Sequence, residues 1–263
     1  ASALEYANTL YTIVAGVFVL SIANVIFPEM SRMSARREDA ALDAQLCGTL
    51  STMLFFLVPM SAGLAVMARP IVRLLYEWGE WTAESTELTA GALAFASLGM
   101  VGYGLQMILS RAYYAAQKGK MPLISGIVSV VMNLALCALL TPRMGVRGLA
   151  LASAVSALVP ALVLLAALLL GGHAVMDRAS LWDFCKMHVC AAGMAAAVLA
   201  VRWDIAGVGG DGVAGRVLAV ALPTIAGVLA YFALALALGA GVMRPVRDKL
   251  MEKAGGNMIE NSF

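Results

Sequence analysis

The feature that most constrains the fold of this chain is a set of seven stretches that contain no Lys, Arg, Asp or Glu. A helix of about 20 apolar residues spans the hydrocarbon core of a bilayer, and a charge at its centre costs roughly 2.5–3.5 kcal/mol. A soluble fold would have to bury seven such helices. The pattern therefore predicts an all-α, polytopic bundle of about seven transmembrane helices. The stretches are residues 10–27, 46–68, 88–110, 121–142, 148–172, 189–201 and 217–243.

The composition supports the same class of protein. Of the 263 residues, 62% are hydrophobic and 13% are charged, whereas a soluble domain has roughly half apolar and a quarter charged residues. We place five spans in residues 1–172, and two further spans with a tail in residues 173–263. Prolines and glycines near the ends of the uncharged stretches set the expected limits. The expected spans are 7–27, 46–68, 88–112, 122–141, 147–170, 184–202 and 216–241.

The connection formed by residues 69–85 has apolar residues with charges on either side. This pattern predicts a short amphipathic helix that lies at the lipid headgroups. Its aromatic residues suit the membrane–water interface, and its acidic residues suit a solvated face. The aromatic residues are Tyr76, Trp78 and Trp81, and the acidic residues are Glu77, Glu80, Glu84 and Glu87.

Basic residues are distributed unequally over the two sides of the predicted bundle. Alternate connections carry twelve Lys and Arg residues on one side and six on the other. The positive-inside rule places the side with twelve in the cytoplasm. The C-terminus is then cytoplasmic and the N-terminus is outside. Without a signal peptide, this orientation predicts that the chain is the later part of a longer protein, with an odd number of earlier spans.

Several chemical functions are not favoured by the sequence. The net charge of +2 does not favour nucleic acid. Cys185, His188 and Cys190 lack a fourth ligand and do not share one helical face, which argues against a metal site. GVGGDG at 207–212 matches a dinucleotide fingerprint only formally, because no strand precedes it. The spans carry no catalytic set of side chains, so we expect neither an enzyme nor a cofactor.

The first span begins with a polar stripe. Glu5, Asn8, Thr9 and Thr12 stand at i, i+3, i+4 and i+7, which places their side chains on one face of a helix. One interpretation is a frayed helix end, with the carboxylate in water and the hydroxyls bonded to i−4 carbonyls. The other is that these residues line a water-filled cavity, because polar groups inside membranes usually line such paths.

A second stripe runs along the fourth span. Ser125, Ser129 and Asn133 stand at i, i+4 and i+8. Small and polar residues at this spacing are typical of helix packing in membranes, where they hydrogen-bond across to a neighbouring helix. A role in a polar pathway is the alternative interpretation.

Several segments resemble a known family. YANTLYTIVAGVFVLSIANVIFPEMSR at 6–32 is similar to the segment that opens the later half of the MurJ/MviN lipid II flippases. RAYYAAQKGKMP at 111–122 resembles a cytoplasmic turn of that family, and Asn133 and GVRGLALASA at 145–154 follow at the expected places. The resemblance covers residues 1–172 with recognisable motifs. The last two spans match only in number and hydrophobicity.

The resemblance implies the second half of a fourteen-span exporter of the MOP superfamily, with two lobes around a central cavity. It implies transport of lipid II, or a similar polyprenyl-diphosphate-linked sugar, across the bacterial cytoplasmic membrane. The partners would then be membrane lipids and the missing N-terminal half. The headgroup would pass through the cavity, with Glu5, Asn8, Thr9 and Thr12 in its wall. The lipid tail would follow a groove that the last two spans help to form.

One departure from the family pattern limits this inference. Thr9 stands where the family has an Arg, and the family uses cavity arginines to hold the diphosphate. Either the missing half supplies the cationic clamp, or the cargo differs. The alternatives are another MOP-type exporter, for a polysaccharide-linked lipid or a drug cation, and a non-transporting scaffold for cell-wall enzymes.

Overall fold

The computed structural model describes residues 2–173, 175, 178–205 and 212–243, and this part of the chain consists of helices joined by turns and loops, with no strand. This confirms the predicted all-α class. The loop 207–211 and the tail 244–263, with its four basic residues, lie outside the described residues. The helices are α1 (Ser2–Ala35), α2 (Asp39–Tyr76), α3 (Ala83–Ser97), α4 (Met100–Ala115), α5 (Lys120–Met144), α6 (Val146–Leu170), α7 (Arg178–Ile205) and α8 (Val213–Ala237), followed by a 3₁₀ turn, η1 (Gly241–Met243).

Six of these helices are long and apolar enough to cross a membrane, and the bent pair α3 and α4 would make a seventh span. The sequence predicted one span over 88–112, and the structure forms this span from two helices. The two helices meet at an angle of 42°. Ser61 Oγ donates to the carbonyl of Ser97 at 2.8 Å, so a buried side chain satisfies a backbone group that the break would otherwise leave open.

Glycines on one side of the break bring α4 against α6. A Cβ at Gly99 would lie 2.8 Å from Ala154 Cα, and one at Gly102 would lie 2.7 Å from the carbonyl oxygen of Ala157. Only a residue without a side chain allows such a close approach of two backbones.

The prediction of a separate amphipathic helix over residues 69–85 was wrong. Instead, α2 continues through Pro59 and Pro70 to Tyr76, as helices in membranes can when neighbours satisfy the freed backbone groups. A short turn follows, and Thr82 then caps the start of α3 by accepting a hydrogen bond from Ser85 N at 3.2 Å.

The aromatic and acidic side chains of this connection contact other parts of the bundle. Tyr76 and Trp81 stack with ring centroids 5.5 Å apart, and Tyr6 of α1 meets Trp81 edge-on. Glu77 does not lie on the solvated acidic face that the sequence predicted. Its carboxylate lies 3.2 Å from Arg73 Nε and 3.8 Å from Arg216 Nη2, because α8 begins beside this turn.

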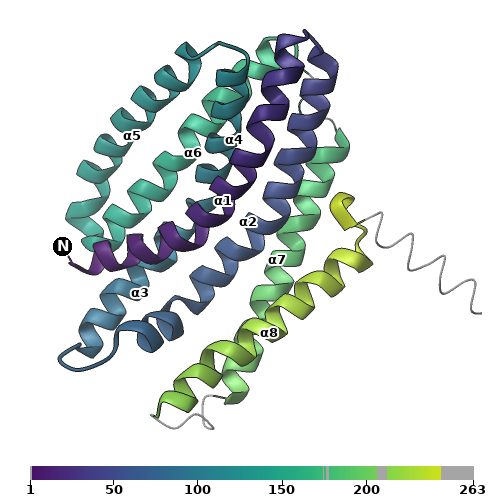
Figure 1. Cartoon of the computed structure of the whole chain (residues 1–263). Helices are drawn as coiled ribbons and strands as arrows, with labels where there is room; N and C mark the ends of the chain where they lie inside the picture. Colours follow the sequence, from purple (N-terminus) through teal and green to yellow (C-terminus); the bar gives the residue numbers. More distant parts are fainter. Residues whose placement is uncertain (1, 174, 176–177, 206–211, 244–263) are drawn as a thin grey trace, which may run out of the picture.

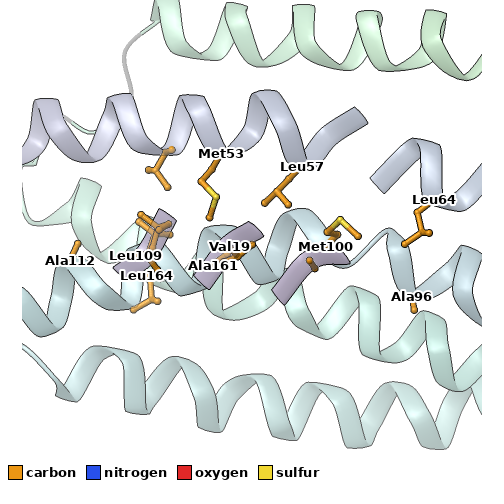
Figure 2. Close-up of a cluster of buried hydrophobic side chains, with 14 of the residues drawn as sticks. Val19, Met53, Leu57, Leu64, Ala96, Met100, Leu109, Ala112, Ala161 and Leu164 are labelled. Atoms are coloured by element: carbon orange, nitrogen blue, oxygen red, sulfur yellow. The ribbon is translucent and has the colours of Figure 1, made fainter. Parts of the chain in front are cut away.

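Two clusters of buried side chains hold the helices together. The larger one joins α1, α2, α3, α4 and α6, and Figure 2 shows part of it, with Val19, Met53, Leu57, Leu109 and Leu164 converging between the helices. The smaller one joins α2 to α7 and α8. In Figure 1, α5 lies at one side of the bundle and α7 with α8 at the other. Nothing in this packing tests the division of the chain at residue 172, which stays a prediction.

Three hydrogen bonds attach the terminal helix pair to backbone carbonyls of α2 and the residue after it. Arg202 Nη1 donates to the carbonyl of Val66 at 2.7 Å, and Arg216 Nη1 donates to that of Glu77 at 2.6 Å. The hydroxyl of Tyr231 donates to the carbonyl of Phe55 at 2.7 Å. The guanidinium of Arg216 also lies over the ring of Trp78, 4.8 Å from its centroid.

Candidate functional site

The polar stripe at the start of α1 lies in a shallow hollow, which we name the outer hollow. Glu5, Asn8, Thr9 and Thr12 are all exposed and line it together with Leu4 and Ile13. Its volume is about 500 Å³. Thr9 Oγ1 donates to the carbonyl of Glu5 at 2.9 Å. This hydrogen bond within the helix agrees with the interpretation of the stripe as a frayed helix end. The helix itself, however, begins before the stripe, at Ser2.

The stripe on α5 is engaged by α6. Ser129 Oγ donates to the carbonyl of Ser156 at 2.9 Å, and Asn133 Nδ2 donates to Ser156 Oγ at 2.8 Å. Ser125 is buried and bonds to the carbonyl of Pro122 within its own helix. The structure therefore does not bring this stripe to the outer hollow. We name these contacts the α5–α6 seam, and their geometry supports the packing interpretation.

Sequence reasoning missed a second hollow, which we name the inner hollow. It lies between the later half of α1 and the start of α2 and has a volume of about 470 Å³. Its polar lining comes from Ser21 of α1 and from Gln45, Thr49 and Thr52 of α2, with Gly48 between them. The signal was present, because Gln45, Thr49 and Thr52 have the same i, i+4, i+7 spacing as Glu5, Thr9 and Thr12.

The two hollows contain little charge. Among the residues that line them, Glu5 is the one charged group, and none is Lys or Arg. A guanidinium or ammonium group is what binds a diphosphate well. The described lining residues of these hollows therefore supply no cationic clamp.

An apolar groove runs between α2 and the terminal helix pair, with Val14 of α1 at its edge. It has a volume of about 360 Å³ and is lined by side chains such as Phe56, Met60, Met194 and Phe232. The one polar side chain of the lining besides Tyr231 is Thr224, whose hydroxyl bonds to the carbonyl of Val220. The groove therefore offers an apolar surface bordered by α7 and α8.

The three residues weighed as metal ligands lie in different surroundings on α7. Cys190 is buried in the smaller cluster, whereas Cys185 is exposed. His188 Nδ1 lies 2.9 Å from the carbonyl of Phe184 in its own helix. Within the described residues, no three His, Cys, Asp or Glu side chains come together as a metal site.

Membrane-length helices, one of them with a polar exposed face, define this chain as a multi-pass helical membrane protein. The sequence model described as "Lipid II flippase MurJ" matches residues 1–210. The chain belongs to the MurJ lipid II flippase family, which is a family of transporters. The match confirms the resemblance seen in the sequence and extends it past residue 172 into α7.

Individual relatives agree with this assignment. The chain is 31% identical to the probable lipid II flippase MurJ of Rhizobium meliloti, over 99% of this chain and 49% of that protein. It is 29% identical to the probable lipid II flippase MurJ of Vibrio cholerae, over 90% of this chain and 45% of that protein. The chain thus spans about half the length of the curated relatives it matches.

The fold also matches a solved structure. This structure is described as "Lipid II flippase MurJ, inward closed conformation", and the TM-score is 0.76 at 25% sequence identity. The match covers 93% of this chain and 47% of that one. The predicted architecture, a helical membrane bundle equivalent to half of an exporter of this type, is thereby confirmed.

Proposed function

We propose that this chain is the C-terminal half of a flippase that moves lipid II from the inner to the outer leaflet of the bacterial cytoplasmic membrane. The observation that carries the proposal is the family match over residues 1–210. The structural match supports it, because it covers nearly all of this chain but only about half of a solved MurJ structure. The partner required for activity is the half of the same protein that precedes these residues.

The exposed face of α1 is the proposed wall of the transport cavity. Glu5, Asn8, Thr9 and Thr12 are exposed in the described part of the chain, at one end of a helix of membrane length. A carboxylate and an amide are costly against lipid, so this face requires water, cargo or the other half of the protein. A cavity between two lobes provides all three, and rocking of the lobes would open it to each side in turn.

The lipid part of the cargo has a separate surface in this proposal. The groove beside α7 and α8 is almost entirely apolar. A polyprenyl chain in this groove would make dispersion contacts with the lining like those that it makes with lipid tails. The diphosphate would be held by cationic residues of the preceding half, because neither hollow of this chain contains one among its described lining residues.

We also propose that the C-terminus is cytoplasmic. The excess of Lys and Arg on one set of connections supports this orientation. Contacts between connections are consistent with it. His173, after α6, lies 2.8 Å from Asp43 at the start of α2, while Arg216, at the start of α8, contacts Glu77 at the end of α2. Alternate connections therefore gather at opposite ends of the bundle.

The test is rescue of bacterial cells that are depleted of their own lipid II flippase. The full-length protein that contains this chain should restore growth and cell shape. In proteoliposomes, the same protein should move lipid II between leaflets. A folded, membrane-inserted protein that neither rescues the cells nor moves lipid II would contradict the proposal, and it would favour a different cargo or a scaffold.

A further inference from the structure

The inner hollow has hydrogen-bonding properties that suggest what it binds. Ser21 Oγ donates to the carbonyl of Val17 at 2.7 Å. Thr49 Oγ1 donates to the carbonyl of Gln45 at 2.7 Å, and Thr52 Oγ1 donates to that of Gly48 at 2.9 Å. A hydroxyl has one hydrogen and two lone pairs. Each of these hydroxyls has therefore given its hydrogen to its own helix, and it presents lone pairs to the hollow.

The rest of the lining is apolar and comes from Ile22, Val25 and Ile26, so a polar group that binds in this hollow must donate hydrogen bonds to the hydroxyl oxygens. The described lining residues include no Lys or Arg, so a phosphate or carboxylate placed here would face acceptors without a compensating charge. Sugar hydroxyls and amide N–H groups can donate to the three hydroxyl oxygens. The Gln45 amide can both donate and accept, so it can satisfy the acceptors that such a ligand also carries.

The outer hollow also presents mainly hydrogen-bond acceptors. Thr9 has donated its hydroxyl hydrogen to the carbonyl of Glu5, and the Glu5 carboxylate is itself an acceptor. Between the two hollows, α1 exposes the apolar side chains of Val17 and Leu20. The two hollows therefore lie at different levels of α1, and both present hydrogen-bond acceptors, which in the inner hollow come mostly from α2.

We propose that the inner hollow is a second binding station for the cargo, which accepts hydrogen bonds from the hydroxyl and amide groups of a sugar–peptide headgroup and does not bind its diphosphate. The inference rests on the proposed function, and it adds Ser21, Gln45, Thr49 and Thr52 as binding residues. A headgroup that leaves one hollow meets the same kind of hydrogen-bonding surface at the other.

Gly48 provides the first test, because a Cβ at this position would meet no atom within 4 Å. Gly48→Trp in the full-length protein should place a large side chain in the hollow, and its Cβ is accommodated without a clash. Gly126→Trp is the matched control, since a Cβ at Gly126 on α5 also meets nothing within 4 Å. With equal amounts of inserted protein, we expect Gly48→Trp to lower lipid II transfer about tenfold or more, and Gly126→Trp to leave it near wild type. Equal transfer by the two variants overturns the second station.

The second test identifies the class of ligand. Thr52→Cys is introduced into a full-length protein whose native cysteines are replaced, and its labelling by a water-soluble thiol reagent is timed. N,N′-diacetylchitobiose should slow the labelling, whereas inorganic pyrophosphate at the same concentration should not. Slowing by pyrophosphate alone, or by neither probe, overturns the inference. A thiol that never labels shows that the preceding half covers the hollow, which also overturns it.

The two proposals can fail separately. If the wild-type protein does not rescue depleted cells, the proposed function is wrong whatever the probes do. If it does rescue them while Gly48→Trp transfers lipid II normally, the flippase stands and the inner hollow is not part of its path.

Discussion

The exposed face of α1 and the α5–α6 seam both contain polar residues three or four positions apart along a helix, but they differ in what surrounds them. In the seam, Asn133 and Ser129 both bond to Ser156 of the neighbouring helix. On α1, Glu5, Asn8 and Thr12 face an open hollow. The comparison shows that spacing predicts a polar stripe, whereas only the neighbouring helix decides whether that stripe packs or stays available to a ligand.

Thiol labelling should separate the two stripes most clearly. In a full-length protein without its native cysteines, Asn8→Cys or Thr12→Cys should react with a small water-soluble reagent about tenfold or more faster than Ser129→Cys, because exposure controls thiol reactivity. Val19→Cys, at a fully buried position of α1, is the unreactive control. Similar rates at positions 8, 12 and 129 would remove the distinction between the face and the seam.

Transport should depend on the α1 face. We expect the double variant Asn8→Leu with Thr12→Val to lower lipid II transfer roughly 10- to 30-fold, since each lost hydrogen bond is worth about 1 kcal/mol. Its melting temperature in detergent should stay close to wild type, because neither side chain has a partner in the described hydrogen bonds. The measurement is transfer per inserted protein in proteoliposomes. A large loss of stability with normal transfer would show that this face is a packing surface.

Stability should depend on the seam. Asn133→Leu removes the donor to Ser156 Oγ, and hydrogen bonds between membrane helices are worth about 1 kcal/mol. We therefore expect a lower melting temperature in detergent, and a smaller loss of transfer per folded protein than in the double variant on α1. Full stability combined with abolished transfer would restore the pathway interpretation of this stripe.

The smallest effect that we expect is a gain in stability. Gly48→Ala should stabilise α2 by about 0.5–1 kcal/mol, because alanine favours the helix and its methyl group meets no atom within 4 Å. Gly102→Ala provides the contrast, since its Cβ would lie 2.7 Å from the carbonyl oxygen of Ala157. Melting temperatures in detergent should move in opposite directions. The same sign for both would contradict the difference between an open and a packed glycine.

The sequence alone predicts the class of fold and the number of membrane passes, because the cost of a charge in lipid is local and large. It does not predict the break between α3 and α4, since residues 88–110 carry no charge that would mark it. The break depends on Ser61 and on the close approach of Gly99 to α6, which are contacts between distant parts of the chain.

The site shows the same limit. The opening stripe was visible because four polar residues interrupt an apolar run. The inner hollow was missed because Gln45 lies just before the span that was predicted to start at residue 46, and because Ser21 comes from another helix. The fate of the α5 stripe depends on Ser156, which is 27 residues from Ser129. No spacing rule within one helix contains that information.

The attachment of α7 and α8 has a consequence for how this protein can change over evolutionary time. Arg202, Arg216 and Tyr231 each donate to a backbone carbonyl. A carbonyl is present whichever amino acid a position encodes, so substitutions at residues 55 and 66 leave the acceptors for Tyr231 and Arg202 in place. Side chains at these positions of α2 can therefore change while α7 and α8 stay attached, provided that the two arginines and the tyrosine are retained.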